Sequence, residues 1–351
     1  MLNKSQAQTV DAGATAIQAN GDVAITNIGL TYENARAVAL DVFQANFYQL
    51  SSMAVETAKA RAQEITEDFL SKLASENPAG LSQSNDPDFQ YVLFSAQREY
   101  ARCGDKELED LLVDLLVDRT KQEQRGMLQI VLNESLNTAP KLTEEQLASL
   151  ALIFLFKYTQ NLQVGNHDQF GSYLDKHAEP FIAKAAKGRA SYQHLEFAGC
   201  GSCSLAMSAL ENILGQVYQG LFLTGFDANE VITRNITTAL HAKFFMPCLN
   251  DPAKLQVRAV NKAQLTKMFD LDSVNDTDRT EINSLFDVGK MSDLEIREKC
   301  VAVRPYVADL FTVWSESDIQ NFTLTSVGMA IGHANVKRLV GKFADLAIWI
   351  N

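Results

Sequence analysis

Two cysteines three positions apart have the spacing that most directly suggests chemistry. Cys200 and Cys203 lie in the run Gly-Cys-Gly-Ser-Cys, and two thiolates at this spacing can share a zinc ion or form a redox pair. A structural zinc site needs four ligands, so His194, His241 and Cys248 would have to converge on the pair through folding alone. A redox pair would need a strand that leads into a helix, whereas the surrounding sequence predicts helices. We therefore expect packing, with no metal and no cofactor, and keep Cys200, Cys203 and His194 as the candidate metal ligands.

The other residues with acid, base or ligand chemistry are scattered. The five histidines show no pair at helical i,i+4 spacing, and we expect structural roles for His167, His177, His194, His241 and His333. Three acids recur every four residues on one predicted helix, where a solvated face explains Asp110, Asp114 and Asp118. A second solvated face is expected for the basic residues Lys337, Arg338 and Lys342.

The first thirty residues differ from the rest of the chain because they carry almost no charge. Small residues that favour strands alternate there with Gly and Asn, which predicts short strands and turns. Asn20-Gly21 is a strong hairpin signal, since both residues tolerate a positive φ. A three-residue loop over 20–22 pairs Ile17 with Ile25 and gives one apolar face, and we favour that register.

An isolated two-stranded hairpin is marginal in water, so this segment needs a partner surface. Low charge, the absence of Pro and interspersed amides suit copies of the segment to pairing with one another. The predicted assembly interface consists of Gln8, Gly13, Ile17, Gln18, Gly21, Asp22, Val23 and Ile25. Two alternatives stay open: a β appendage packed on its own helical body, and a disordered tail.

Two resemblances accompany these residues. Gln8, Gly13 and the run 17–23 resemble the short Gln/Gly-Asp repeat at the N-terminus of many bacterial conflict and antiphage proteins, which implies self-association or signalling assembly. The body resembles a bacterial family of conserved proteins of unknown function, chiefly over 89–124 and 322–351, with Leu-Thr-Ser-Val-Gly at 324–328 and His-Ala-Asn at 333–335. The second resemblance supplies no catalytic residues.

Composition limits the classes of partner and the cellular compartment that we expect. A net charge of −12 opposes a broad grip on phosphate backbones, so nucleic acid is not an expected partner. Residues 1–6 lack the apolar core of a signal peptide, and the odd count of 5 Cys favours reduced thiols; we expect a cytoplasmic protein. The longest nearly unbroken apolar run, 147–156, is too short to cross a bilayer, so no integral membrane segment is expected.

Helical periodicity then dominates the chain. Residues 31–75 contain no Gly or Pro and carry an apolar stripe, which predicts one very long helix of roughly 65 Å. Asp86-Pro87, Gly104-Asp105 and the Thr143/Gln146 capping box mark further helix boundaries. Short strands are expected in the C-terminal lobe at 255–260, 322–325 and 348–350.

The predicted fold class is mainly α: a helical bundle with one very long N-terminal helix, preceded by a short N-terminal β segment and with a few short strands in the C-terminal lobe. The expected domains are a β assembly segment (1–29), a helical bundle lobe (30–164) and a mostly helical C-terminal lobe (165–351).

We expect a self-associating sensor or scaffold of bacterial antiphage defence without chemistry of its own. It would form a homo-oligomer through the N-terminal segment and the long helix, with a protein as a candidate trigger. One alternative is an enzyme whose active or metal site lies near Cys200 and Cys203. The other is an effector that acts on membranes once assembly triggers it.

Overall fold

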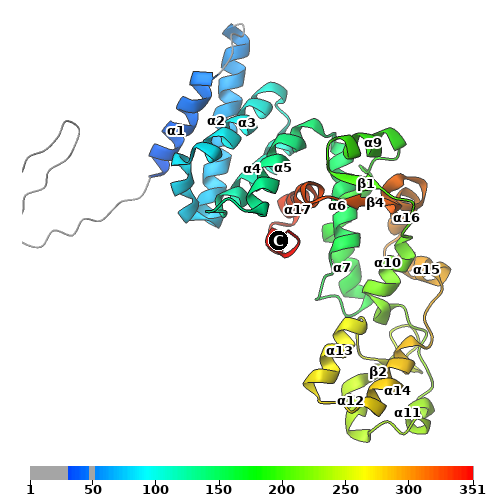
Figure 1. Ribbon diagram of the computed structural model, residues 1–351. Helices are drawn as coiled ribbons and strands as arrows, with labels where there is room; N and C mark the ends of the chain where they lie inside the picture. The colour runs from blue at the N-terminus through cyan, green and yellow to red at the C-terminus, as the bar shows by residue number, and fades with distance from the viewer. Residues whose placement is uncertain (1–30, 47–51, 351) are drawn as a thin grey trace, which may run out of the picture.

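The computed structural model describes residues 31–46 and 52–350 and is mainly helical, as predicted (Figure 1). The expected hairpin and all of its assembly residues lie outside the described residues. The first helices gather at one end of the molecule, α6 and α7 lie in the middle, and the small helices α11 to α14 form the other end (Figure 1). Among the described helices, none combines the length and apolar character that crossing a membrane requires.

The N-terminal helices are α1 (Tyr32–Asn46), α2 (Ser52–Glu76), α3 (Pro87–Cys103), α4 (Lys106–Thr120), α5 (Met127–Thr138) and α6 (Glu144–Tyr158). The middle of the chain forms α7 (His167–His177), α8 (Glu179–Ile182), α9 (Arg189–Phe197), α10 (Leu210–Val217), α11 (Asn229–Thr233), α12 (His241–Phe244), α13 (Lys262–Leu271) and α14 (Asp276–Asp287). The C-terminal helices are α15 (Asp293–Val303), α16 (Val307–Glu316) and α17 (Ser326–Val340). The strands are β1 (Gly201–Cys203), β2 (Phe245–Pro247), β3 (Leu255–Val257) and β4 (Phe322–Leu324). The 3-10 helices are η1 (Pro78–Asn85), η2 (Ala139–Lys141), η3 (Gln219–Leu221), η4 (Thr238–Leu240), η5 (Asp318–Gln320) and η6 (Leu346–Ile348).

The single long helix expected over 31–75 is wrong. The chain forms α1 and α2, which pack against each other, and Arg36 Nη2 lies 2.8 Å from Glu67 Oε1. A straight helix would separate two residues 31 positions apart by about 46 Å. Ala35 and Ala39 on α1 are buried in the same hydrophobic cluster as Ile65 and Phe69 of α2. An apolar stripe fits two packed helices as well as it fits one long helix.

The predicted helix boundaries are confirmed. The Asp86 carboxylate accepts the Phe89 N–H at 2.8 Å and begins α3, and Gly104, with a φ of +67°, ends that helix. A positive φ at this position favours glycine. Asp105 then caps α4. Both hydrogen bonds of the Thr143/Gln146 capping box are present at the start of α6.

The last long helix, α17, packs along α6 and contacts α4 and α5 (Figure 1). A small residue permits this close approach, since a Cβ on Gly332 would lie only 2.8 Å from the Leu150 carbonyl oxygen. Asn335 Nδ2 donates to the Leu147 carbonyl at 2.9 Å. One hydrophobic cluster therefore runs from α1 to residue 350. The lobe division after residue 164 stays a prediction.

The solvated acid face expected on α4 is wrong for two of its three residues. Asp110 is exposed, but Asp114 and Asp118 are buried against α17. Lys337 Nζ lies 3.2 Å from Asp114 Oδ1 and 3.1 Å from Asp118 Oδ1. Lys337 is itself buried, which also corrects the basic face expected on α17. Sequence spacing placed these charges on helix faces but could not show that the two faces meet.

Additional cations complete this ion cluster. Lys72 Nζ lies 2.8 Å from Asp114 Oδ2, Lys121 Nζ lies 2.6 Å from Asp118 Oδ1, and Lys337 Nζ also lies 2.9 Å from Glu76 Oε2. The Asp114 oxygens accept no well-aligned hydrogen bond, so the attraction there is mainly electrostatic. The cluster joins α2, α4 and α17, and therefore ties the C-terminal helix to the N-terminal bundle.

Two short strand pairs support the predicted strands in the second half. β3 falls within the strand expected at 255–260 and pairs antiparallel with β2. β4 falls within the strand expected at 322–325 and pairs antiparallel with β1, where Gly201 lies opposite Leu324. The strand expected at 348–350 is wrong, because Asp345 accepts the Ala347 N–H and begins the turn η6 instead.

A second hydrophobic cluster lies within residues 223–286. Phe244 and Phe269 stack at its centre with ring centroids 5.4 Å apart. It includes helices α12, α13 and α14 and the β2–β3 pair, which form the lower end in Figure 1. This unit and the rest of the body are therefore packed around different apolar cores.

Candidate functional site

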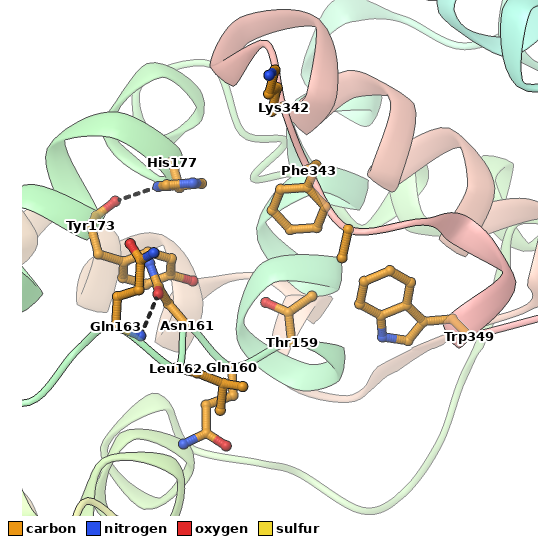
Figure 2. Close-up of a pocket in the computed structure, with 11 residues that line it drawn as sticks. Thr159, Gln160, Asn161, Leu162, Gln163, Tyr173, His177, Lys342, Phe343 and Trp349 are labelled. Carbon is orange, nitrogen blue, oxygen red and sulfur yellow. Dashed lines mark hydrogen bonds between the residues drawn. The ribbon is translucent and has the colours of Figure 1, made fainter. Parts of the chain in front are cut away.

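A cleft opens where three segments meet: the chain after α6, the helix α7, and the chain after α17 (Figure 2). Its volume is about 410 Å³, and its lining residues are Thr159, Gln160, Asn161, Leu162, Gln163, Tyr173, His177, Lys342, Phe343, Ala344 and Trp349. We call this the α7 cleft. A neighbouring hollow of about 500 Å³ continues along α7 and shares Asn161, Gln163, Tyr173, His177 and Lys342 with it. The two hollows therefore form one continuous depression.

Local sequence signals position the cleft walls. Asn166 begins α7 by accepting the Gln169 N–H at 2.9 Å, and Gln169 in turn accepts the Gly165 N–H at 2.8 Å. On the opposite side, Gly341 ends α17 with a φ of +83°. Glycine adopts this conformation readily, so the chain turns out of the helix and brings Lys342 and Phe343 to the cleft.

Two aromatic rings form one wall of the α7 cleft. Phe343 and Trp349 are half-buried, with centroids 6.2 Å apart and planes inclined by 23°. Trp349 Nε1 donates to the Tyr158 carbonyl at 2.8 Å, which fixes the indole. Behind the wall, Phe154 packs edge-on against Trp349 at 5.0 Å, and His333 packs against Phe343 at 5.5 Å. The wall is therefore held in place by a buried aromatic cluster.

His177 and Tyr173 form the facing wall (Figure 2). Burial lowers the pKa of His177, so its imidazole is neutral at pH 7. Its Nδ1 lies 3.1 Å from the Tyr173 carbonyl oxygen. Because a carbonyl oxygen can only accept, Nδ1 carries the proton and Nε2 is left as an acceptor. Burial also raises the pKa of Tyr173, so its hydroxyl is protonated, and this hydroxyl is hydrogen-bonded to Tyr218 and Thr159.

The charge of the α7 cleft contrasts with the acidic chain. Lys342 is the formally charged residue among those that line the 410 Å³ hollow. The neighbouring hollow adds Lys176 and a single acid, Asp168. Both lysines are exposed, and within the described residues neither forms an ion pair. The cleft therefore offers unpaired cations beside an aromatic wall.

The candidate metal ligands lie elsewhere. Cys200 is fully buried just before β1, and burial raises its pKa to about 12. Cys203 is exposed at the end of β1, and burial of its thiol with the nearby acids Asp318 and Glu196 raises its pKa as well. His194 Nδ1 lies 3.0 Å from Gln146 Nε2. In the parts of the chain that the structure describes, no three His, Cys, Asp or Glu residues gather into a metal site.

The other histidines have structural contacts. His167 Nε2 lies 3.0 Å from the Leu221 carbonyl, and His241 Nε2 lies 2.9 Å from the Ile236 carbonyl. His333 Nε2 lies 2.7 Å from the Ala344 carbonyl and anchors the segment that lines the α7 cleft. This agrees with the structural roles expected for these residues and leaves His177 as the histidine at the cleft.

Sequence reasoning missed the α7 cleft. The sequence places Lys342 in a basic patch, His177 among the structural histidines and Trp349 in the strand expected at 348–350, and it assigns no role to Phe343. The signal closest to the site is the amide-rich run Thr-Gln-Asn-Leu-Gln at 159–163, directly after the apolar helix. Such a run is compatible with an ordinary loop, so it could not by itself predict a cleft.

Comparison with known families places almost the whole described body in one group. A family model described as ":-like" matches residues 29–350, and the chain belongs to that family. The description states no activity. No curated protein and no solved structure matches the chain.

Proposed function

We propose that this protein is a self-associating sensor or scaffold of bacterial antiphage defence, that it acts in the cytoplasm, and that it has no chemistry of its own. The observation that carries the proposal is the position of the family match, which begins at residue 29. The change from a segment with almost no charge to an ordinary charged sequence falls at nearly the same place. Residues 1–28 therefore differ from the rest of the chain in two ways: the family model does not cover them, and their composition is different. The resemblance of this segment to the Gln/Gly-Asp repeat supplies the defence context.

The body offers a way to couple the N-terminal segment to the rest of the chain. α1 begins at Tyr32, just after the segment, and is held on the bundle by buried Ala35 and Ala39 and by the Arg36–Glu67 ion pair. Subunits joined through residues 1–29 would therefore be joined close to their helical bundles. The α7 cleft gives such an assembly a place to receive a trigger, which favours a sensor over a passive scaffold.

The geometry gives less support to the other two functions. The high pKa of Cys200 disfavours the thiolate that a metal or a nucleophilic mechanism requires. Within the Cys200/Cys203 pair, Cys203 is exposed and Cys200 is fully buried, so the two thiols do not face a common solvent-accessible site. An effector that acts on membranes would depend on amphipathic helices that insert after rearrangement. Neither alternative has a specific structural observation in its favour.

The test places charge on the predicted assembly face. Ile17→Lys combined with Ile25→Lys should yield a smaller particle with unchanged helical content, because like charges repeat at every buried interface. Gln18→Ala is the matched control, and it should weaken assembly less because it adds no charge. The readouts are solution mass, circular dichroism and protection of cells against phage. A double-lysine variant with the mass of the wild-type protein would show that this face is not the interface.

A further inference from the structure

We propose that the α7 cleft binds a nucleoside monophosphate, with the base on the aromatic wall and the phosphate at Lys342. This proposal rests on the proposed function, because it names the ligand class that a sensor would detect. It assigns Lys342, Phe343, Trp349 and His177 to ligand binding. The argument uses the size, the rigidity, the hydrogen-bonding groups and the charge of the cleft.

Size is the first criterion. Small-molecule sites usually have volumes of about 300 to 1,000 Å³. The 410 Å³ hollow lies within that range, and the neighbouring hollow extends it along α7. A nucleotide is longer than it is wide, so it suits a depression that continues in one direction. A surface for a protein partner would need a much larger area.

The aromatic wall suits a flat ring. Phe343 and Trp349 lie nearly parallel, are half-buried and line the open space (Figure 2). The hydrogen bond from Trp349 Nε1 to Tyr158 and the packing of Phe154 hold the indole without a ligand. A base can therefore stack with little loss of side-chain freedom, which is the usual way proteins bind bases regardless of sequence.

The remaining polar groups suit the edges of a base. Neutral His177 presents Nε2 as an acceptor, and its ring centroid lies 6.2 Å from that of Phe343. Gln163 and Asn161 line both hollows; Asn161 Oδ1 already accepts the Gln163 N–H at 2.9 Å, which leaves Asn161 Nδ2 as a donor and the Gln163 side-chain amide as a donor and acceptor. A purely apolar ligand would leave these groups without partners, which is unfavourable. The cleft therefore favours a ring with polar edges.

The charge of the cleft favours an anion. Lys342 is the formally charged residue among those that line the 410 Å³ hollow, and no carboxylate lines that hollow. Lys176 adds a second cation farther along α7, where Asp168 is the single acid. This local excess of positive charge contrasts with the net charge of −12 of the whole chain. Phosphate is an anion that lysine commonly binds.

The experiment uses the full chain and measures binding by calorimetry and by tryptophan fluorescence. Trp314 is fully buried, so a fluorescence change on binding should come from Trp349. AMP should bind saturably, whereas adenosine and inorganic phosphate should each bind about tenfold more weakly. Adenosine lacks the phosphate that Lys342 binds, and inorganic phosphate lacks the base that stacks on the aromatic wall. Trp349→Phe should lose the fluorescence change and weaken AMP binding, because the smaller ring cannot donate to the Tyr158 carbonyl and offers less stacking surface.

Charge variants separate phosphate recognition from general effects. Lys342→Gln should weaken AMP binding by about tenfold and leave adenosine binding unchanged, because it removes one charged contact. Lys187→Gln is the matched control, since Lys187 is also exposed but lies outside the cleft. Circular dichroism checks that each variant is folded.

Two results would overturn the proposal. One is the absence of saturable binding of AMP, GMP, CMP and UMP at millimolar concentration; the other is equal AMP affinity for Lys342→Gln and the wild-type protein. If no nucleoside monophosphate binds while the Ile17→Lys/Ile25→Lys variant still loses assembly, only the ligand assignment is wrong. If AMP binds but the double-lysine variant assembles normally, only the predicted assembly face is wrong.

Discussion

Replacing Lys337 by methionine should destabilise the protein strongly. Methionine keeps the length of the side chain but removes the ammonium that lies near Asp114, Asp118 and Glu76. Removing one partner of a buried ion pair costs about 3 to 5 kcal/mol, because the other charge stays buried without compensation. Lys72 and Lys121 remain beside the two aspartates, so we expect about 3 kcal/mol, near the lower limit.

The loss should depend on pH in a defined direction. Burial alone would raise the pKa of Asp118, but Lys337 and Lys121 outweigh burial and lower it. A carboxyl with a lowered folded-state pKa stabilises the fold above its unfolded pKa of about 4 and loses that contribution as the pH falls further. Burial would lower the pKa of Lys337, but the charges of Asp118, Asp114 and Glu76 outweigh burial and raise it, so the ionisation of Lys337 matters only at alkaline pH. The effect of Lys337→Met should therefore be largest at pH 7 and shrink below about pH 4.

The assay is urea unfolding followed by helical circular dichroism at pH 7 and at pH 3, below the unfolded pKa of the carboxyls. Lys342→Met is the matched control, because Lys342 is an exposed lysine on the chain that follows the same helix, and its replacement should change stability by less than about 0.5 kcal/mol. A loss for Lys337→Met of less than about 1 kcal/mol, or one that is equal at both pH values, would refute the assigned role of the ion cluster.

Two further predictions concern β1 and its neighbours. Replacing Cys200 and Cys203 together by Ser should leave metal content and fold unchanged and cost about 1 to 2 kcal/mol; zinc that is stoichiometric in the wild-type protein and lost in the variant would contradict this. Gly328→Ala should cost about 1 to 3 kcal/mol in the same unfolding assay, because its Cβ would lie 1.9 Å from the Cys200 carbonyl oxygen. Gly188→Ala, whose Cβ would meet nothing within 4 Å, should cost far less, and equal losses for the two glycines would refute the argument.

Local signals in the sequence predicted local structure well. Helix ends are set by residues close to one another in the sequence, so a short stretch is enough to predict them. Examples are the caps at Asp86, Asp105 and Thr143 and the helix end at Gly104. The strands at 255–257 and 322–324 were also found from alternation. β1 was missed, because its three residues gain strand structure only by pairing with β4, more than a hundred positions away.

Apart from the strand expected at 348–350, the errors depend on contacts between distant segments. The sequence between α1 and α2 contains no Gly or Pro, and only the packing of the two helices against each other decides against one long helix. Asp114 and Asp118 have the spacing of a solvated face, yet α17 returns to cover them. The α7 cleft likewise combines residues from 159–177 with residues from 342–349, and no motif in either stretch refers to the other.

Assembly through the N-terminal segment is the central claim, and solution mass with and without residues 1–29 tests it most directly. The body has its own helix caps and hydrophobic clusters, so the shortened chain should keep its helical circular dichroism and melt cooperatively. We predict that the full chain has the mass of an oligomer and that the shortened chain has the mass of a folded monomer or a smaller oligomer. Equal subunit counts for the two chains, with both folded, would contradict the proposed function.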